Sequence, residues 1–169
     1  MTVSIRPART HDVAEIRRLV DLYVSKRILL DKATVTLYED VQEFLVAESD
    51  GAGLSGCGAL HVMWEDLAEV RTLAVDPAAR GTGVGHLLLD ALLDRARDLG
   101  VQRVFCLTFE VEFFSQHGFH EIDGTPVTPE VYAEMLRSMD EGVAEFLDLA
   151  RVKPNTLGNH RMLLELKGE

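Results

Sequence analysis

The chain of 169 residues has few cysteines and few basic residues: it contains Cys57 and Cys106, and 17 lysines and arginines against 28 aspartates and glutamates. Two cysteines do not form a disulfide framework, so we expect a reducing, cytoplasmic location. The net charge of −11 argues against a broad nucleic-acid surface, which would be basic. No apolar run approaches the ~18 residues that a membrane span needs. Residues 1–6 also lack the basic and apolar regions of a signal peptide.

The composition is that of an ordinary globular domain, with 47% hydrophobic and 27% charged residues. Apolar periodicity and turn residues indicate strands and helices in one order along the chain. We predict strands at 3–6, 43–49, 54–64, 69–75, 101–109, 119–122 and 162–166, and helices at 10–23 with Thr10 as N-cap, 35–41, 83–99, 113–117 and 130–149, with a break at 153–155. This order predicts one α/β (α+β) domain, a central mixed sheet flanked by helices.

A glycine-rich loop, Arg80-Gly81-Thr82-Gly83-Val84-Gly85, joins a predicted strand to the most regular predicted helix. Glycines let the backbone adopt positive φ and approach a ligand closely, and N–H groups at a helix start favour anions. Arg80 adds a guanidinium suited to phosphate. The loop lacks the lysine of a Walker A motif and the glycine spacing of a dinucleotide fingerprint. A plain turn into a structural helix stays as the alternative.

The loop and its surroundings resemble the GNAT N-acetyltransferase superfamily. Arg-x-x-Gly-x-Gly follows Leu73-Ala74-Val75-Asp76-Pro77, and the segment 113–119 ends in Gly-Phe, as in a later motif of that superfamily. Within it, the chain resembles the acetyltransferase domain of N-acetylglutamate synthases, in a short single-domain form. The matching pieces are Ile28-Leu29-Leu30, Glu69 to Val75, Leu107-Thr108 and Asn159 to Leu163. We therefore expect one N-acetyltransferase domain over 1–169, with a core at 1–122 and a helical segment and last strand at 123–169.

The resemblance implies acetyl-CoA as co-substrate and no metal. Backbone groups of Leu73, Ala74 and Val75 would contact the pantetheine arm, and the N–H of Leu73 would polarise the thioester. The loop would hold the pyrophosphate through Arg80, Gly81, Thr82, Gly83, Val84, Gly85 and His86. Glu69 would take the proton of the attacking amine. Many superfamily members have a tyrosine acid where this chain has Phe114, so Ser115 is the remaining candidate acid.

The resemblance also implies a small-molecule amino-acid substrate. Its carboxylates would be bound near Leu30, Asp31, Lys32, Arg71 and Arg161. Asp31 stands where the family has a cation, which favours glutamine at least as much as glutamate. The function implied is acetyl-CoA-dependent α-N-acetylation of glutamate or glutamine, the first step of arginine biosynthesis.

Two other functions and the oligomeric state stay open. The alternatives are acetylation of a cationic amine or a protein N-terminus, and a non-catalytic acyl-CoA-binding regulatory module. A homodimer is left open as well. His117 and His120 flank a Gly-Phe turn rather than share a helix face, so we expect no metal site there.

Overall fold

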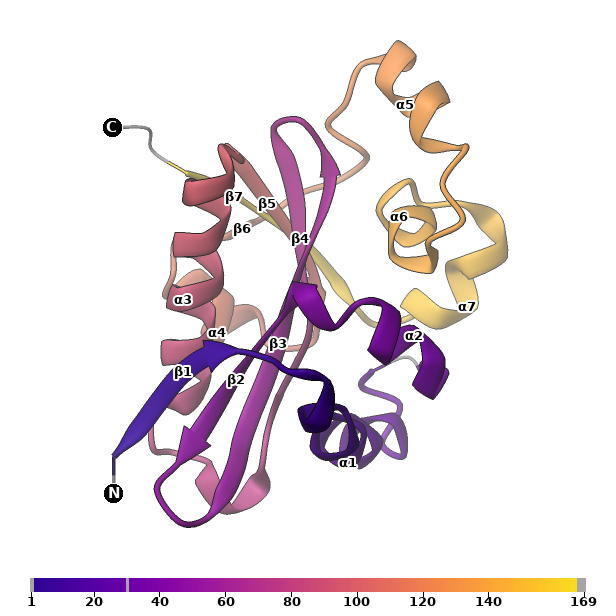
Figure 1. The fold of residues 1–169 in the computed structure, drawn as a ribbon. Helices are drawn as coiled ribbons and strands as arrows, with labels where there is room; N and C mark the ends of the chain where they lie inside the picture. The colour runs from indigo at the N-terminus through magenta and orange to yellow at the C-terminus, as the bar shows by residue number, and fades with distance from the viewer. Residues whose placement is uncertain (1, 30, 167–169) are drawn as a thin grey trace. The chain divides into compact units, whose positions relative to one another are not determined.

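The computed structural model describes residues 2–29 and 31–166, which form a mixed α/β fold (Figure 1). Its strands hydrogen-bond in the order β1-β2-β3-β4-β5-β7-β6. The chain divides into two compact units, one with the residues up to His61 together with Val70–Gly100, the other with Val62–Glu69 and the residues from Val101 onward. Strands β3 and β4 run through both units. The predicted fold class, a mixed sheet with helices, is confirmed, whereas the domain boundaries stay a prediction.

The first unit joins the N-terminal strands to two long helices. Its elements are β1 (Val3–Pro7), α1 (Val13–Val24), α2 (Thr34–Glu39), β2 (Phe44–Ser49), the first part of β3 (Gly53–Trp64), the second part of β4 (Leu67–Val75) and α3 (Val84–Leu99). Strands β1, β2 and β3 pair antiparallel, with Val3 opposite Ser49 and Phe44 opposite Ala59. The apolar stripe of α1 is buried in this unit, with Ile16 and Leu19 at most 1% exposed.

Helix α3 packs against β3 where that strand has no side chains. A Cβ added to Gly56 would lie 2.8 Å from Leu88 Cδ1, and one added to Gly58 would lie 2.9 Å from Leu92 Cδ1. Both leucines are fully buried. Because van der Waals contact needs about 3.5 Å or more between carbons, any larger residue on β3 would displace these leucines.

The second unit is built around β5. It comprises β5 (Arg103–Thr108), α4 (Val111–Ser115), β6 (His120–Glu121), α5 (Pro129–Met135), α6 (Glu141–Phe146), α7 (Lys153–Thr156), β7 (His160–Glu165), and the adjoining parts of β3 and β4. Strand β4 pairs parallel with β5 from Leu67 to Glu69, and β7 pairs antiparallel with all of β5. Phe105 and Phe146 stack edge to face at 4.9 Å in its core.

Three local predictions were wrong. Thr10 does not cap α1, because residues 10–12 form a 3₁₀ turn and the Asp12 carboxylate accepts from the N–H of Arg9 at 2.7 Å. The helix predicted at 130–149 is two short helices, since Asp140 caps a new one by accepting from the N–H of Val143 at 2.9 Å. Pro154 does not break the chain into coil. It lies in the first turn of α7, where its missing N–H costs nothing.

Asp12 offers a stability test in the first unit. Its side chain is 5% exposed and forms two hydrogen bonds with Arg6, at 2.8 and 3.0 Å. These bonds, ahead of the Arg9 N–H, lower the pKa of Asp12 despite its burial. A carboxylate with a lowered pKa stabilises the fold above its unfolded pKa of about 3.9, and this contribution is lost as pH falls through the folded value.

We therefore expect Asp12→Asn to lower the free energy of unfolding by about 3 kcal/mol at pH 7, because it removes the buried carboxylate that pairs with Arg6 and leaves that arginine only the exposed Glu48. The difference from wild type should shrink below pH ~4. Glu48→Gln is the matched control: it removes the other carboxylate on Arg6, which is 47% exposed, and should cost under about 1 kcal/mol. Urea unfolding at several pH values measures both, and equal losses would contradict the assignment.

Candidate functional site

The glycine loop has the backbone that an anion site requires. Gly81 and Gly83 have φ of 78° and 86°, and an added Cβ would meet no protein atom within 4 Å at either. Gly83 is the N-cap of α3, so the N–H groups of Val84, Gly85 and His86 form the helix's first turn, where they have no carbonyl partner within the helix. The space beside these glycines is open, and the donors at the helix start fit a phosphate.

The turn before the loop is fixed by its own hydrogen bonds. The Asp76 carboxylate accepts from the N–H of Ala78 at 2.9 Å and from Arg18 of α1 at 3.0 Å, and these bonds lower its pKa. The N–H groups of Arg80 and Thr82 donate to the carbonyls of Pro77 and Ala79, and the Thr82 hydroxyl also donates to Ala79. The N–H and hydroxyl of Thr82 therefore hold the loop in shape, while the Arg80 side chain is exposed.

Strand β4 carries an irregularity directly before the predicted pantetheine segment. Thr72 has φ of 57°, in the left-handed region that non-glycine residues rarely adopt. Leu73 and Val75 are partly exposed, and Ala74 is buried in the core. The hydroxyl of Tyr23 donates to the carbonyl of Val75. The Tyr23 hydroxyl thereby fixes the backbone of Val75, whose expected contact with pantetheine stays a prediction.

An arginine that we did not predict, Arg17, holds the start of the predicted acceptor segment. Arg17 of α1 pairs with Asp31 at 2.9 Å and donates to the carbonyl of Lys32. Asp31 is 74% exposed, whereas the Arg17 side chain is only 20% exposed. Lys32 is partly exposed, and the predicted site residue Leu30 lies outside the described residues. The negative charge at position 31 is therefore already paired with a guanidinium.

The predicted base, Glu69, is buried in the second unit. It is 4% exposed, lies opposite Phe105 of β5, and has an interaction partner of its own. It is not the solvated charge that its acidic neighbours in the sequence would suggest. Arg71, two residues further along β4, is partly exposed and also has a partner.

Arg161 is held by main-chain carbonyls. Its terminal nitrogens donate to Glu145 at 3.0 Å, Phe146 at 2.6 Å and Gly124 at 2.9 Å. Its Cζ lies 5.0 Å from the centre of the Phe105 ring. Nε is buried and has no hydrogen-bond partner among the described residues. Burial lowers the pKa of Arg161, and the charges of Asp148 and Glu69 act in the opposite direction.

The predicted acid, Ser115, lies next to buried aromatic residues. Ser115 is exposed at the end of α4, where its carbonyl accepts from the N–H of Gly118 at 3.0 Å. Its neighbour Phe114 is buried against Phe119, with ring centres 5.2 Å apart. Both cysteines are buried, which raises the pKa of Cys57 to about 12 and that of Cys106 well above its usual value. Neither thiol is an accessible nucleophile.

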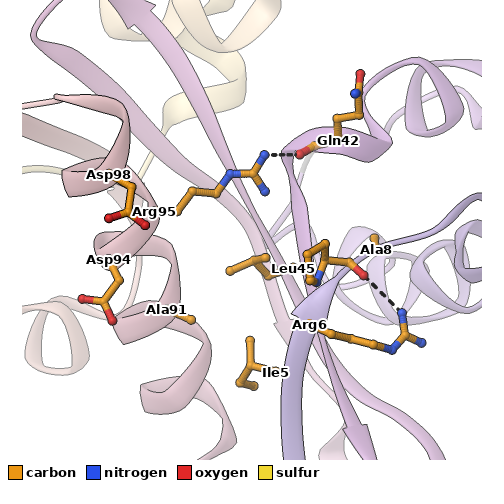
Figure 2. A pocket seen from close by; sticks show the side chains of 10 residues that line it. Ile5, Arg6, Ala8, Gln42, Leu45, Ala91, Asp94, Arg95 and Asp98 are labelled. Atoms are coloured by element: carbon orange, nitrogen blue, oxygen red, sulfur yellow. Dashed lines mark hydrogen bonds between the residues drawn. The ribbon is translucent and has the colours of Figure 1, made fainter.

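A separate cavity of about 570 Å³ lies in the first unit (Figure 2). Its floor is apolar, with Ile5, Leu45 and Ala91, and its rim carries Asp94, Asp98 and Arg95 of α3. Arg95 donates to the main-chain carbonyl of Gln42 across the opening. None of the residues that we predicted for the site lines this cavity.

Two absences hold for the part of the chain that the structure describes. Between residues 2 and 166, leaving out 30, no group of three or more histidines, cysteines, aspartates or glutamates is placed to hold a metal ion. Over the same residues, no helix is both long and apolar enough to cross a membrane.

Comparison with known proteins decides the family. The sequence profile of the acetyltransferase (GNAT) family matches residues 11–121. The chain belongs to the GNAT acetyltransferase family. It is 64% identical over 164 residues to an amino-acid acetyltransferase of Mycobacterium tuberculosis, which covers 96% of this chain and 94% of that relative. The predicted superfamily, and with it an enzyme of the acyltransferase class, are confirmed.

Two similar solved structures of GNAT enzymes contain bound molecules. The crystal structure of Rv2747 from Mycobacterium tuberculosis in complex with CoA and NLQ has a TM-score of 0.94, with 63% identity over 97% of this chain and 99% of that one. N-acetylglutamate synthase from Neisseria gonorrhoeae, complexed with CoA and N-acetyl-glutamate, has a TM-score of 0.78 and 28% identity. This chain spans only 36% of that synthase. Both relatives bind CoA, which confirms the predicted coenzyme.

The loop assignment makes a first binding prediction for this GNAT enzyme. Gly83→Val should weaken acetyl-CoA binding more than tenfold, over ~1.4 kcal/mol, because a side chain would block the approach of the backbone to the pyrophosphate. Gly51→Val is the matched control, since Gly51 has φ of 73° and equally open surroundings in a hairpin turn. It should carry the same backbone strain and bind normally. Calorimetric titration of folded variants decides, and unchanged affinity in Gly83→Val would remove the loop from the coenzyme site.

Proposed function

We propose that this GNAT enzyme acetylates the α-amino group of a free amino acid, glutamine or glutamate, with acetyl-CoA. The observation that carries this proposal is the 64% identity, over nearly the whole chain, to an amino-acid acetyltransferase. The relative solved with N-acetyl-glutamate supports an acidic side chain on the acceptor. A role in the first step of arginine biosynthesis, a cytoplasmic location and a homodimer remain predictions.

The first unit would bind and orient the coenzyme. When bound, acetyl-CoA supplies the acetyl group as a thioester. Gly81, Gly83 and the first turn of α3 would hold its pyrophosphate through N–H groups, with Arg80 as an added cation. The N–H of Leu73, which follows the irregular Thr72, would donate to the thioester oxygen and stabilise the negative charge that develops there. A comparable donor contributes about 3 kcal/mol in other acyl-transfer enzymes.

Glu69 would move the proton of the amine. An ammonium group has no lone pair for attack, so it must lose a proton to a base, directly or through one water. The amine nitrogen then bonds to the acetyl carbon, the carbon–sulfur bond breaks, and the thiolate of CoA leaves and takes up a proton. Phe114 has no proton to give, which leaves Ser115 or water as the donor. Glu69 is suited to this role because it is buried, and the strand register places it on the same face of the sheet as Arg161.

One assay separates this proposal from the alternatives. CoA thiol release is measured with the twenty amino acids, with polyamines and with a peptide N-terminus, and acetyl-CoA binding is measured by calorimetry. We expect release with glutamine or glutamate. Release with polyamines or the peptide alone would favour a cationic or N-terminal acceptor, and binding without any release would favour a non-catalytic module.

Glu69→Gln tests the proposed base. The variant should bind acetyl-CoA normally and lower kcat by roughly 10²–10⁴. The loss should shrink as pH rises, because more acceptor is then present as free amine. Glu65→Gln is the control, since Glu65 is exposed in the same hairpin and lies only four residues away. Wild-type turnover of Glu69→Gln at neutral pH would exclude Glu69 as the base.

The choice of acceptor gives a further prediction. A γ-carboxylate needs its own cation when it is desolvated, and Asp31 neutralises Arg17 in this region. We expect kcat/KM for glutamine to equal or exceed that for glutamate. Asp31→Asn, which removes one of the two carboxylates paired with Arg17, should shift the ratio toward glutamate. Asp21→Asn removes the other carboxylate on Arg17, also exposed, and serves as the comparison. A tenfold preference of the wild type for glutamate would refute the prediction.

A further inference from the structure

Arg161 and Glu69 lie on one face of the sheet in the second unit. Glu69 is opposite Phe105 on β5, and Phe105 is opposite Leu163 on β7. Directly paired residues point to the same face, and so do residues two apart on one strand. Arg161 is two residues before Leu163, so its side chain shares the face of Glu69, with the Phe105 ring between them. The guanidinium lies over this ring at 5.0 Å.

Helix α6 covers this same face. Phe146, at its end, is fully buried against Phe105, and Leu67 and Leu163 belong to the same core cluster. A helix exposes its last carbonyls at its negative end. Arg161 donates to two of them, those of Glu145 and Phe146, and Thr125 donates to the carbonyl of Phe146 at 3.1 Å. The C-terminal end of α6 is therefore capped by a partly buried cation.

Arg161 has no carboxylate in ion-pair contact among the described residues, although it is a desolvated cation. Its terminal nitrogens are all directed at carbonyls, which leaves Nε as the nitrogen without a partner. The negative charges that act on it are those of Glu69 and Asp148. Arginine typically binds a carboxylate through two parallel hydrogen bonds. The terminal nitrogens of Arg161 already donate to carbonyls, so they are poorly placed to bind a carboxylate in that way.

We propose that Arg161 is a positioning residue that clamps the end of α6 onto the Phe105–Leu163 face and places a positive charge on the face that also carries Glu69. This inference rests on the proposed function only for the part that concerns Glu69 as base. It differs from the sequence expectation, in which Arg161 binds the substrate carboxylate directly.

The clamp and the charge can be separated by substitution. Arg161→Lys keeps the charge but cannot bridge three carbonyls, and Arg161→Gln removes the charge as well. Thr125→Val removes one hydrogen bond to the Phe146 carbonyl without changing any charge. Arg151→Gln is the control, because Arg151 is an exposed arginine that pairs with the exposed Glu141 at 2.7 Å. The other titratable groups near Arg161 and Glu69 stay constant in all variants: Glu145, Asp148, Cys106 on the opposite face of β5, and Arg71 further along β4.

Amide hydrogen exchange tests the clamp and does not depend on enzymatic activity. The amides of Leu147 and Leu149, bonded to Val143 and Ala144, should exchange at least about tenfold faster in both Arg161 variants and measurably faster in Thr125→Val. Arg151→Gln should match the wild type. Unchanged exchange in the Arg161 variants would overturn the clamp.

Two measurements test the effect of the charge on Glu69. One is the midpoint of an NMR titration of the Glu69 carboxyl carbon, and the other is the midpoint of the acid limb in the pH profile of kcat/KM. A nearby cation lowers a carboxyl pKa, so Arg161→Gln should move both midpoints up by about 1 pH unit. Arg161→Lys and Thr125→Val should leave them near the wild-type values. Unmoved midpoints in Arg161→Gln, with the loss confined to a higher KM for the acceptor, would overturn the proposal and make Arg161 a carboxylate ligand.

Two results distinguish failure of this inference from failure of the proposed function. If the wild type releases no thiol with any amino acid, the proposed function fails, while exchange and the carboxyl titration still test Arg161. If Arg161→Gln does not fold, Arg161→Lys carries the test, with faster exchange and an unmoved Glu69 midpoint as the expected pair. A moved midpoint in Arg161→Lys would contradict the assignment to charge.

Discussion

The close packing of α3 on β3 is the constraint on which the coenzyme loop depends. Leu88 and Leu92 occupy the space that side chains at Gly56 and Gly58 would fill. The position of the helix on the strand is thereby fixed, and with it the place where the helix begins. The loop must then turn sharply into that start, and Gly83 provides the turn with its left-handed backbone. Apolar packing in this way places the donors of the first helical turn, and Asp76 fixes the turn before the loop.

This arrangement explains how a chain with a net charge of −11 can bind an anionic coenzyme. Several of its arginines are engaged by its own carboxylates: Arg6 by Asp12, Arg18 by Asp76, and Arg103 by Asp66. These pairs fix elements, as Asp76 fixes the turn before the loop, and they leave little free positive charge. Backbone N–H groups carry no net charge and are not neutralised by such pairing. The anion site can therefore form within an acidic molecule.

The features predicted from sequence are those determined by local patterns. The apolar periodicity of α3, its terminal Gly100 and the loop glycines placed that helix to within one residue. The features missed depend on contacts between distant residues. Arg17 meets Asp31 across fourteen positions, and Arg161 reaches the carbonyls of Glu145 and Phe146. The positive φ of Thr72 has no sequence signal at all, since threonine is an ordinary strand residue. Local patterns thus predict the glycine loop and its helix, and they say little about the contacts of Asp31 and Arg161.

The part of the chain outside the family profile carries Arg161 and the carbonyls that it binds. The profile ends at residue 121, yet β7 pairs with β5 along its whole length and brings Arg161 with it. Helix α6 buries Phe146 on the same strands. A family defined by a common coenzyme needs a common loop, whereas its acceptors differ and need different surroundings for the base. We therefore expect family members to differ in the segments that cover the face of Glu69. In this chain Arg161 joins the covering segment to that face by binding main-chain carbonyls. Residues 145 and 146 would provide these carbonyls whatever their side chains.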